Sequence, residues 1–421
     1  MTAPSRKPRV LILSYAFPPD NFAGAARPYR FAKFLQRLGY PVTVIAAGPG
    51  ARVSQEDNVF RVAGEIYGRP PTNGVSRLVE KAARIVWLPY DEGITWVPRA
   101  VALASRWRQE TCVLFSTSPP LTTHLAALAL QRRYGWKWIA DFRDPLTGNP
   151  VRCQRRVKWS DRILERVIFS RSDAVIANTD RVLEHWISRS RESAGKFHLV
   201  WNGFDPDQIL EAAPVPARDY SVLTHTGGMY PQRHPGQLLR TLNRLVKAGE
   251  IRPAQLRVRL IGSQSSTYLP DATDFAELTR AGVLEETVER IPPGEVARCL
   301  ATSDYLLLLD IIAGQTGMQV PSKIFDYIRI GRPILASTTP NSPVERILSE
   351  SGVPHTCLYP DLGDAERDRR VLEFLRLPNT PVRASETFTT RFDAQHQAEG
   401  LADLISGLYS PRTDHAQRVF P

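Results

Sequence analysis

The chain has little cysteine and no long apolar run. Among its 421 residues only four cysteines occur, far apart, with neither a C-x-x-C pair nor a histidine cluster beside them. This spacing argues against a zinc site or disulfide framework and predicts reduced cytosolic thiols. No run of eighteen apolar residues is present, and no secretory signal is apparent behind Met1. We therefore expect a cytoplasmic protein, either soluble or peripheral at the inner face of the plasma membrane. The cysteines are Cys112, Cys153, Cys299 and Cys357.

Length and composition indicate a globular protein of two domains. Hydrophobic residues make up 43% of the chain and charged residues 23%, as in ordinary globular proteins. A length of 421 residues is too great for one comfortable hydrophobic core. The net charge of +11 points to an acidic partner, such as nucleotide phosphates, nucleic acid or an anionic membrane.

The first half of the chain alternates strand-like and helix-like segments. An apolar run at 10–13 is followed by a loop rich in proline and glycine, a helical pattern at 29–38 and a second apolar run at 42–45. This order is typical of a β-loop-α-β unit. A parallel sheet with helices on both faces is the economical interpretation. Further strands are predicted at 113–115, 138–140, 175–177 and 198–201.

The alternation restarts after a linker at 202–219. We therefore predict an α/β fold of two doubly wound Rossmann-like domains. The first comprises 1–203, with a C-terminal helix at about 392–421 packing back on it, and the second comprises 204–391. Open α/β sheets bind ligands beyond the carboxyl ends of their strands, so two domains facing a central cleft suit a donor and an acceptor. The second domain is expected to contain strands at 222–224, 258–261, 305–309 and 334–336 and a helix at 236–248.

The loop after the first predicted strand carries Pro18, Pro19 and Gly24. It is no G-x-G-x-x-G sequence, so the dinucleotide fingerprint is absent. Gly24 beside a helix N-terminus lets backbone N–H groups approach an anion without a Cβ in the way. A plain β–α turn is the alternative.

A second candidate lies at the end of the strand at 138–140, where Asp141 and Asp144 flank Arg143. Two carboxylates with an arginine between them suit acid–base or hydroxyl-orienting work, because the arginine can hold one carboxylate ionised. A structural Arg–Asp pair is the alternative. His124 is the nearest other base, although a lone histidine on a helix rich in alanine and leucine is more often structural.

A third candidate follows the strand at 222–224. Gly227 and Gly228, with Arg233 five residues on, form a predicted phosphate cradle of backbone amides and a guanidinium. A generic glycine-rich turn is the alternative.

The fourth and most informative stretch is 320–336. A Pro-Ser entry, an eight-residue helix pattern, the stop at Gly331 and a buried-looking strand place Lys323 and Asp326 within one turn of a helix start. A phosphorylated ligand docks at such a position. Alternatively, Asp326 only complements the helix dipole.

Together these motifs resemble family-four glycosyltransferases of the GT-B fold, in the subgroup of bacterial cell-surface polysaccharide enzymes. The resemblance rests on the Pro-Pro…Gly loop, on Gly-x-x-Tyr-x-x-Arg, and on Pro-Ser-Lys-x-x-Asp-Tyr before Gly-x-Pro, and it spans about 10–404. It implies an acceptor-side first domain, a donor-binding second domain and retention at the anomeric carbon.

The resemblance also implies roles for single residues. Gly24, Gly227, Gly228 and Arg233 would lie near the donor diphosphate, and Lys323 would replace a family lysine missing after Arg233. The first of two family glutamates falls on Met318, whereas Asp326 takes the position of the second, near the donor ribose. Further donor-side residues are Gly262 near the base, Ser322 at the helix start, and Gln315, Thr316 and Gly317 near the sugar; His124 and Arg143 would lie on the acceptor side.

The expected activity is transfer of a hexosyl or N-acetylhexosaminyl group from a nucleotide-diphosphate sugar to an acceptor hydroxyl. Arg233, Lys323 and loop amides would stabilise the departing diphosphate, so neither a metal nor a cofactor is expected. Asp141 or Asp144 would orient the acceptor. An epimerase acting on a UDP-amino sugar is one alternative, and a binding relative without catalysis is another, because Met318 lacks a carboxylate.

A basic stretch at 152–171 combines seven arginines and lysines with Trp159, Ile163 and Phe169. This spacing is typical of a basic amphipathic helix that meets an anionic membrane surface, where a lipid-linked saccharide acceptor would be found. An ordinary surface helix is the alternative. We expect no nucleic-acid partner, since neither a zinc finger nor an RNA-recognition signature is present.

Overall fold

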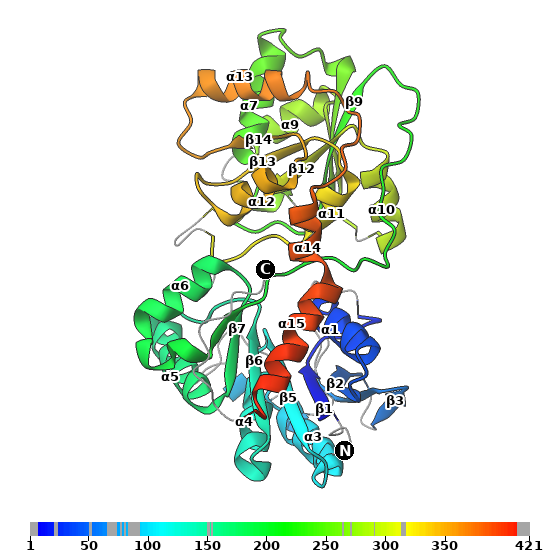
Figure 1. The fold of residues 1–421 in the computed structure, drawn as a ribbon. Helices are drawn as coiled ribbons and strands as arrows, with labels where there is room; N and C mark the ends of the chain where they lie inside the picture. The colour runs from blue at the N-terminus through cyan, green and yellow to red at the C-terminus, as the bar shows by residue number, and fades with distance from the viewer. Residues whose placement is uncertain are drawn as a thin grey trace. The chain divides into compact units, whose positions relative to one another are not determined.

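The computed structural model describes residues 7–20, 24–49, 53–64, 74–75, 78–79, 81–82, 93–149, 152, 155–262, 265–269, 272–289, 291–312 and 317–410, with backbone only at 155–158, 265 and 266. The chain forms two compact units. Unit 1 comprises Met1–Pro206 with Arg391–Pro421, and unit 2 comprises Asp207–Thr390 (Figure 1).

Unit 1 is built on an eight-stranded sheet in the order β3-β4-β2-β1-β5-β6-β7-β8. Neighbouring strands are parallel except at the β3–β4 edge. The central strands are completely buried because helices cover both faces, as the continuous apolar runs predict. The strands are β1 (Arg9–Ser14), β2 (Val42–Gly48), β3 (Ser54–Glu56), β4 (Val59–Ala63), β5 (Cys112–Ser118), β6 (Lys137–Phe142), β7 (Ala174–Ala177) and β8 (Phe197–Leu199).

The core of unit 1 is completed by a helix from the far end of the chain. α15 packs against α1, where Leu401 and Ile405 share a buried cluster with Phe31 and Leu35 (Figure 1). The helix predicted at about 392–421 corresponds to α15, which Asp393 caps by accepting from the Gln395 amide at 2.6 Å; residues 411–421 lie outside the described residues. The helices are α1 (Ala26–Arg37), α3 (Trp96–Ala104), α4 (Thr122–Tyr134), α5 (Arg155–Arg171), α6 (Asp180–Arg189) and α15 (Ala394–Gly407), whereas α14 (Glu386–Phe392) begins in unit 2 and ends in unit 1.

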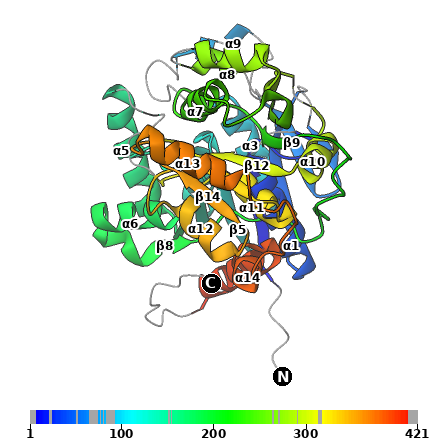
Figure 2. The ribbon, with the colours of Figure 1, turned by 90° about the horizontal axis from the view of Figure 1, so that it is seen from above.

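Unit 2 contains a six-stranded parallel sheet in the order β11-β10-β9-β12-β13-β14. Helix α7 packs between α9 and α13, and α11 contacts α10 and α12 (Figure 2). The strands are β9 (Ser221–Thr226), β10 (Leu256–Ile261), β11 (Leu284–Thr287), β12 (Tyr305–Leu309), β13 (Ile334–Ser337) and β14 (His355–Leu358), and the helices are α7 (Gly236–Lys247), α8 (Ser265–Tyr268), α9 (Thr273–Arg280), α10 (Pro293–Ala301), α11 (Lys323–Ile330), α12 (Pro343–Ser351) and α13 (Asp364–Phe374).

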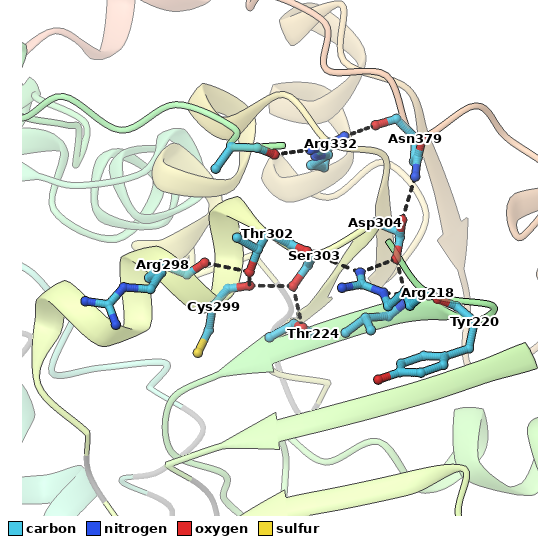
Figure 3. A network of polar contacts seen from close by, with 12 residues as sticks. Arg218, Tyr220, Thr224, Arg298, Cys299, Thr302, Ser303, Asp304, Arg332 and Asn379 are labelled. Atoms are coloured by element: carbon cyan, nitrogen blue, oxygen red, sulfur yellow. Dashed lines mark hydrogen bonds and ion pairs between the residues drawn. The ribbon is translucent and has the colours of Figure 1, made fainter. Parts of the chain in front are cut away.

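A buried polar network secures the amino edge of the unit 2 sheet, just before β12. Asp304 pairs with Arg218 at 2.6 Å and accepts a hydrogen bond from the Asn379 amide at 2.5 Å (Figure 3). Arg332 donates to the backbone oxygens of Asn379 and Ala213. The network therefore fixes both the segment that enters unit 2 and the segment that returns from it, and it leaves the opposite edge of the sheet uninvolved.

Candidate functional site

The carboxyl edge of unit 2 contains a topological switch point between β9 and β12. The chain leaves β9 for β10 and β11 on one side and then continues with β12 on the other, and such a reversal opens a ligand crevice in doubly wound sheets. The register between β9 and β12 runs through Leu223 and Thr224 only. Beyond it, the His225 imidazole Nδ1 lies 2.8 Å from the Leu307 carbonyl oxygen of β12. A side chain therefore spans the two strands where backbone pairing stops.

Two glycines line this edge next to one another. Gly227 follows β9 with φ +106°, and Gly262 follows β10 with φ +73°. A Cβ atom on Gly262 would lie 3.9 Å from the Gly227 backbone, whereas one on Gly228 would meet only the Tyr230 hydroxyl, at 3.8 Å. Residues with side chains rarely adopt such φ values, so glycine is required at positions 227 and 262. The predicted glycine loop thus presents bare backbone at the crevice.

Lys323 reaches this loop from the first residue of α11. Its ammonium group donates a hydrogen bond to the Thr226 carbonyl oxygen and lies against Gly227. Part of the side chain is accessible to solvent, but the ammonium end is enclosed. Burial, and then the nearby charge of Arg233, lower the pKa of Lys323 from 10.5 to about 7. An anion bound here would favour the charged form.

Arg233 is held beside the crevice by a tight reversal of the chain. The amides of Tyr230 and Arg233 donate to each other's carbonyl oxygens, at 3.1 and 2.9 Å, and the guanidinium lies 5.4 Å from the centre of the Tyr230 ring. The Ile312 amide donates to the Gln232 oxygen at 2.9 Å, which ties this loop to the end of β12. The arrangement brings the two predicted cations, Arg233 and Lys323, within electrostatic range of each other.

Two further polar residues at this edge were not predicted as site residues. His225 is fully buried, and Asp310, which is 3% exposed, accepts hydrogen bonds from the Thr338 hydroxyl at 2.8 Å and the Ile311 amide at 2.7 Å. Burial raises the pKa of Asp310 to about 6, against the lowering effects of these two donors and of Arg233. Asp310 directly follows the apolar strand β12, and this placement is a signal in the sequence, whereas His225 lies between two threonines of β9 and has no such signal.

Unit 1 has its own switch point, between β1 and β5. Arg143 joins the two loops there, since its guanidinium donates to the backbone oxygens of Gly24, Ser118 and Pro119. A Cβ atom on Gly24 would lie 2.5 Å from an Arg143 nitrogen. A side chain at position 24 would therefore displace the Arg143 guanidinium, which joins both loops at the crevice.

Asp141 is a structural residue, contrary to its predicted acceptor role. Its carboxylate accepts from Arg27 Nη2 at 2.8 Å, from Arg27 Nε at 3.1 Å and from the Thr117 hydroxyl at 2.7 Å. The Asp141 and Arg27 side chains are 0% and 2% exposed. The ion-pair partner of Asp141 is therefore Arg27 and not the neighbouring Arg143. A carboxylate so enclosed is not accessible to an acceptor hydroxyl.

His124 likewise belongs to the interior. Its Nδ1 lies 2.7 Å from the Ser116 hydroxyl, and the Phe142 ring packs at 4.4 Å. Burial, and then the charge of Arg143, lower the pKa of His124 to about 3. The histidine is neutral and fully buried, so the hypothesis of an acceptor-side base is replaced by a structural role. Asp144, partly buried in the bend after β6, is the predicted carboxylate that stays at the carboxyl edge.

Residues 26–208 match the model of Glycosyltransferase Family 4. The resemblance to family-four glycosyltransferases is confirmed. Sucrose-phosphate synthase from Thermosynechococcus elongatus has 12% identity and a TM-score of 0.67, with 96% of this chain and 99% of that chain covered. HepE of Anabaena with UDP-glucose has 14% identity and a TM-score of 0.60, with 95% and 99% covered. The lipopolysaccharide galactosyltransferase WaaB has 12% identity and a TM-score of 0.60, with 94% and 99% covered.

These structural matches confirm the GT-B fold, and no curated protein sequence matches the chain.

The residues predicted to bind the donor at the start of α11 differ in their burial and contacts. Ser322 precedes the helix but is exposed and makes no capping bond. Asp326 lies partly buried in the first turn, and Gly317 and Met318 are buried. Their donor-side roles stay predictions, and Gln315 and Thr316 lie outside the described residues.

Two surface hollows lie away from the β9–β12 switch point. A groove of about 760 Å³ in unit 1 runs from Pro18 and Pro19, in the loop after β1, along α1 to Asp57. A hollow of about 670 Å³ in unit 2 lies at the amino edge of the sheet beside Arg218 and Arg252. The site assignment therefore rests on topology and on the grouping of charges, because neither hollow contains the predicted donor residues.

Proposed function

We propose that the chain transfers a hexosyl or N-acetylhexosaminyl group from a nucleotide-diphosphate sugar to an acceptor hydroxyl, with retention at the anomeric carbon. The observation that carries this proposal is the grouping of Lys323 and Arg233 with the bare backbone of Gly227 at the β9–β12 switch point. Two cations beside a glycine without a side chain are suited to a diphosphate.

The chemistry follows from where charge develops. When the bond between the sugar and the diphosphate breaks, negative charge grows on the leaving phosphate oxygen. Lys323 and Arg233 interact more strongly with this charge in the transition state than with the intact donor in the ground state. This difference lowers the activation barrier, so neither a metal nor a cofactor is needed. Asp326 is proposed to hold the ribose hydroxyls, and Asp144 to orient the acceptor.

Several solved structures of the same fold support a nucleotide-sugar donor. HepE was solved with UDP-glucose and with UDP and glucose, and a trehalose-6-phosphate protein from E. coli with UDP-2-fluoro glucose. We therefore rank UDP-sugars first among the candidate donors.

A thermal-shift screen of UDP, GDP, ADP, dTDP and their sugars tests the proposal. At least one should raise the melting temperature, Arg233→Ala should abolish the shift, and Asp326→Ala should weaken it. Arg252→Ala is the matched control, because this exposed arginine of unit 2 lies at the opposite edge of the sheet. If no nucleotide or nucleotide sugar stabilises the chain, the donor-site proposal fails.

Met318 favours a second candidate, a nucleotide-binding relative without catalysis. It stands where the family has a glutamate, and its side chain is 5% exposed. Slow hydrolysis of the bound donor without acceptor would exclude this candidate. Conversion of the donor into an isomer under the same conditions would instead indicate an epimerase.

We further propose that α5 places the enzyme on an anionic membrane, where a lipid-linked saccharide serves as acceptor in polysaccharide or glycolipid assembly. Trp159 is 61% and Ile163 38% exposed, and the exposed Arg162 and Arg166 occupy the same helical face. This combination favours insertion at an anionic interface. No helix of the described part of the chain is long and apolar enough to cross a bilayer. Absence of binding to anionic liposomes, or equal binding by Trp159→Ser, would contradict the membrane proposal.

A further inference from the structure

His225 lies in β9, two residues before Gly227 of the proposed diphosphate site. A hydrogen bond fixes which of its ring nitrogens carries the proton. Nδ1 is 2.8 Å from the Leu307 carbonyl oxygen, which can only accept a hydrogen bond. Nδ1 therefore carries the proton in the neutral ring. Burial, and then the positive charge of Lys323, hold the pKa of His225 well below 6.5, so the ring stays neutral.

The second ring nitrogen has a lone pair and no partner. Nε2 is buried and makes no hydrogen bond within the described residues. A buried acceptor of this kind is unfavourable unless a donor reaches it. The two cations that act on the ring are Lys323 and Arg233, both of the proposed diphosphate site.

Lys323 is the better matched donor. Its ammonium has three hydrogens, and one of them is directed to the carbonyl oxygen of Thr226, the residue next to His225. We propose that His225 is a positioning residue for Lys323. When a diphosphate binds, the Lys323 ammonium group donates its second hydrogen bond to Nε2 of His225 and its third to the diphosphate. This inference rests on the proposed donor site and adds to it the group that orients its lysine.

The test uses inorganic pyrophosphate, which presents a diphosphate without base or sugar, and isothermal titration. In His225→Asn the amide can still donate to Leu307 while the Nε2 acceptor is removed, so affinity should fall about tenfold. His355→Asn is the matched control, since the Nδ1 of His355 also bonds to a backbone carbonyl, that of Val353, but at the amino end of β14. This control should bind like the wild type.

A double-variant cycle separates positioning from a purely structural role. His225→Asn should have no further effect in a Lys323→Met background, because the lysine that it orients is already gone. Unchanged affinity of the single variant, or additive losses in the double variant, would overturn the proposal. Additive losses of affinity would show that His225 acts through a group other than Lys323, such as Arg233.

A measurement on the unmodified chain guards against loss of folding in the variant. Nitrogen-15 NMR of labelled histidine should show protonation of Nδ1 alone, and a shift of the Nε2 resonance when pyrophosphate is added. Protonated Nε2 or an unmoved resonance would overturn the inference. If the wild type binds neither pyrophosphate nor any nucleotide sugar, the proposed function fails as well, whereas wild-type binding that His225→Asn leaves intact overturns the inference alone.

Discussion

A Cβ atom on Gly227 would lie 2.5 Å from the Lys323 ammonium nitrogen. Gly227→Ala should therefore weaken nucleotide-sugar binding, because the lysine has to move away from the loop. The alanine also has to adopt φ +106°, which should destabilise unit 2 by roughly 1–3 kcal/mol. Calorimetric binding and urea unfolding measure the two effects. Gly249→Ala is the control, because this glycine also has a positive φ, +76°, but its added Cβ has no heavy atom within 4 Å. It should lose stability without losing affinity, and equal losses of affinity in both variants would contradict the assignment.

Lys323 gives donor binding a distinct pH dependence. In the free protein its pKa is about 7, so the amine is mostly neutral above that pH. A bound diphosphate favours the ammonium form, and binding must then take up a proton. Affinity for the selected nucleotide sugar should fall by up to about tenfold per pH unit above about pH 7. Titrations in buffers of different ionisation enthalpy should detect the proton. A pH-independent affinity, or a slope retained in Lys323→Met, would contradict this origin.

The buried Arg27–Asp141 pair predicts a loss of stability from Asp141→Asn. The exchange leaves the Arg27 charge uncompensated inside unit 1, and the free energy of unfolding should fall by about 3–5 kcal/mol. All eight tryptophans lie in residues 87–201, so tryptophan fluorescence in urea reports on unit 1 alone. Asp144→Asn should leave this transition in place but reduce sugar transfer. The reverse pattern would restore Asp141 as the acceptor residue.

Glu165 should make unit 1 more stable in mild acid. Burial raises the pKa of this carboxyl from 4.5 to about 7, although Thr147 donates to it through its amide and hydroxyl. Between these pH values the folded state keeps a proton that the unfolded state has released. The free energy of unfolding of unit 1 should therefore fall by on the order of 3 kcal/mol as pH rises through this window.

The same fluorescence measurement checks Glu165 at both ends of the window. Glu165→Gln should remove the decline, since the amide cannot ionise. The exposed Glu192→Gln should retain it. A decline of equal size in the Glu165 variant would show that another group is responsible.

The two parallel sheets could be predicted because their central strands are continuous apolar runs. Four of the described strands were not predicted. Three are the edge strands Ser54–Glu56, Leu284–Thr287 and His355–Leu358, which have no apolar run or alternation long enough for periodicity to detect. The fourth, Val59–Ala63, is apolar and lies inside the sheet, so its pattern was missed. Cys112, Cys299 and Cys357 are free, as predicted, and Cys153 lies outside the described residues.

Site residues could be predicted where a glycine or a lysine follows a strand or starts a helix, as at Gly227 and Lys323. Their partners could not be predicted. Asp141 meets Arg27 from 114 positions away, and this choice over the nearby Arg143 depends on how β1 and β6 are arranged in the sheet. Local sequence carries no information about such pairing.

Helix α15 has a consequence for the order in which the protein is made. Its residues leave the ribosome after all of unit 2, yet they complete the core of unit 1. Until then the α1 surface around Phe31 and Leu35 has no cover, while unit 2 already has all its strands. The first unit to be synthesised is thus the last to close, and the nascent chain presents an apolar surface to chaperones throughout the synthesis of the second.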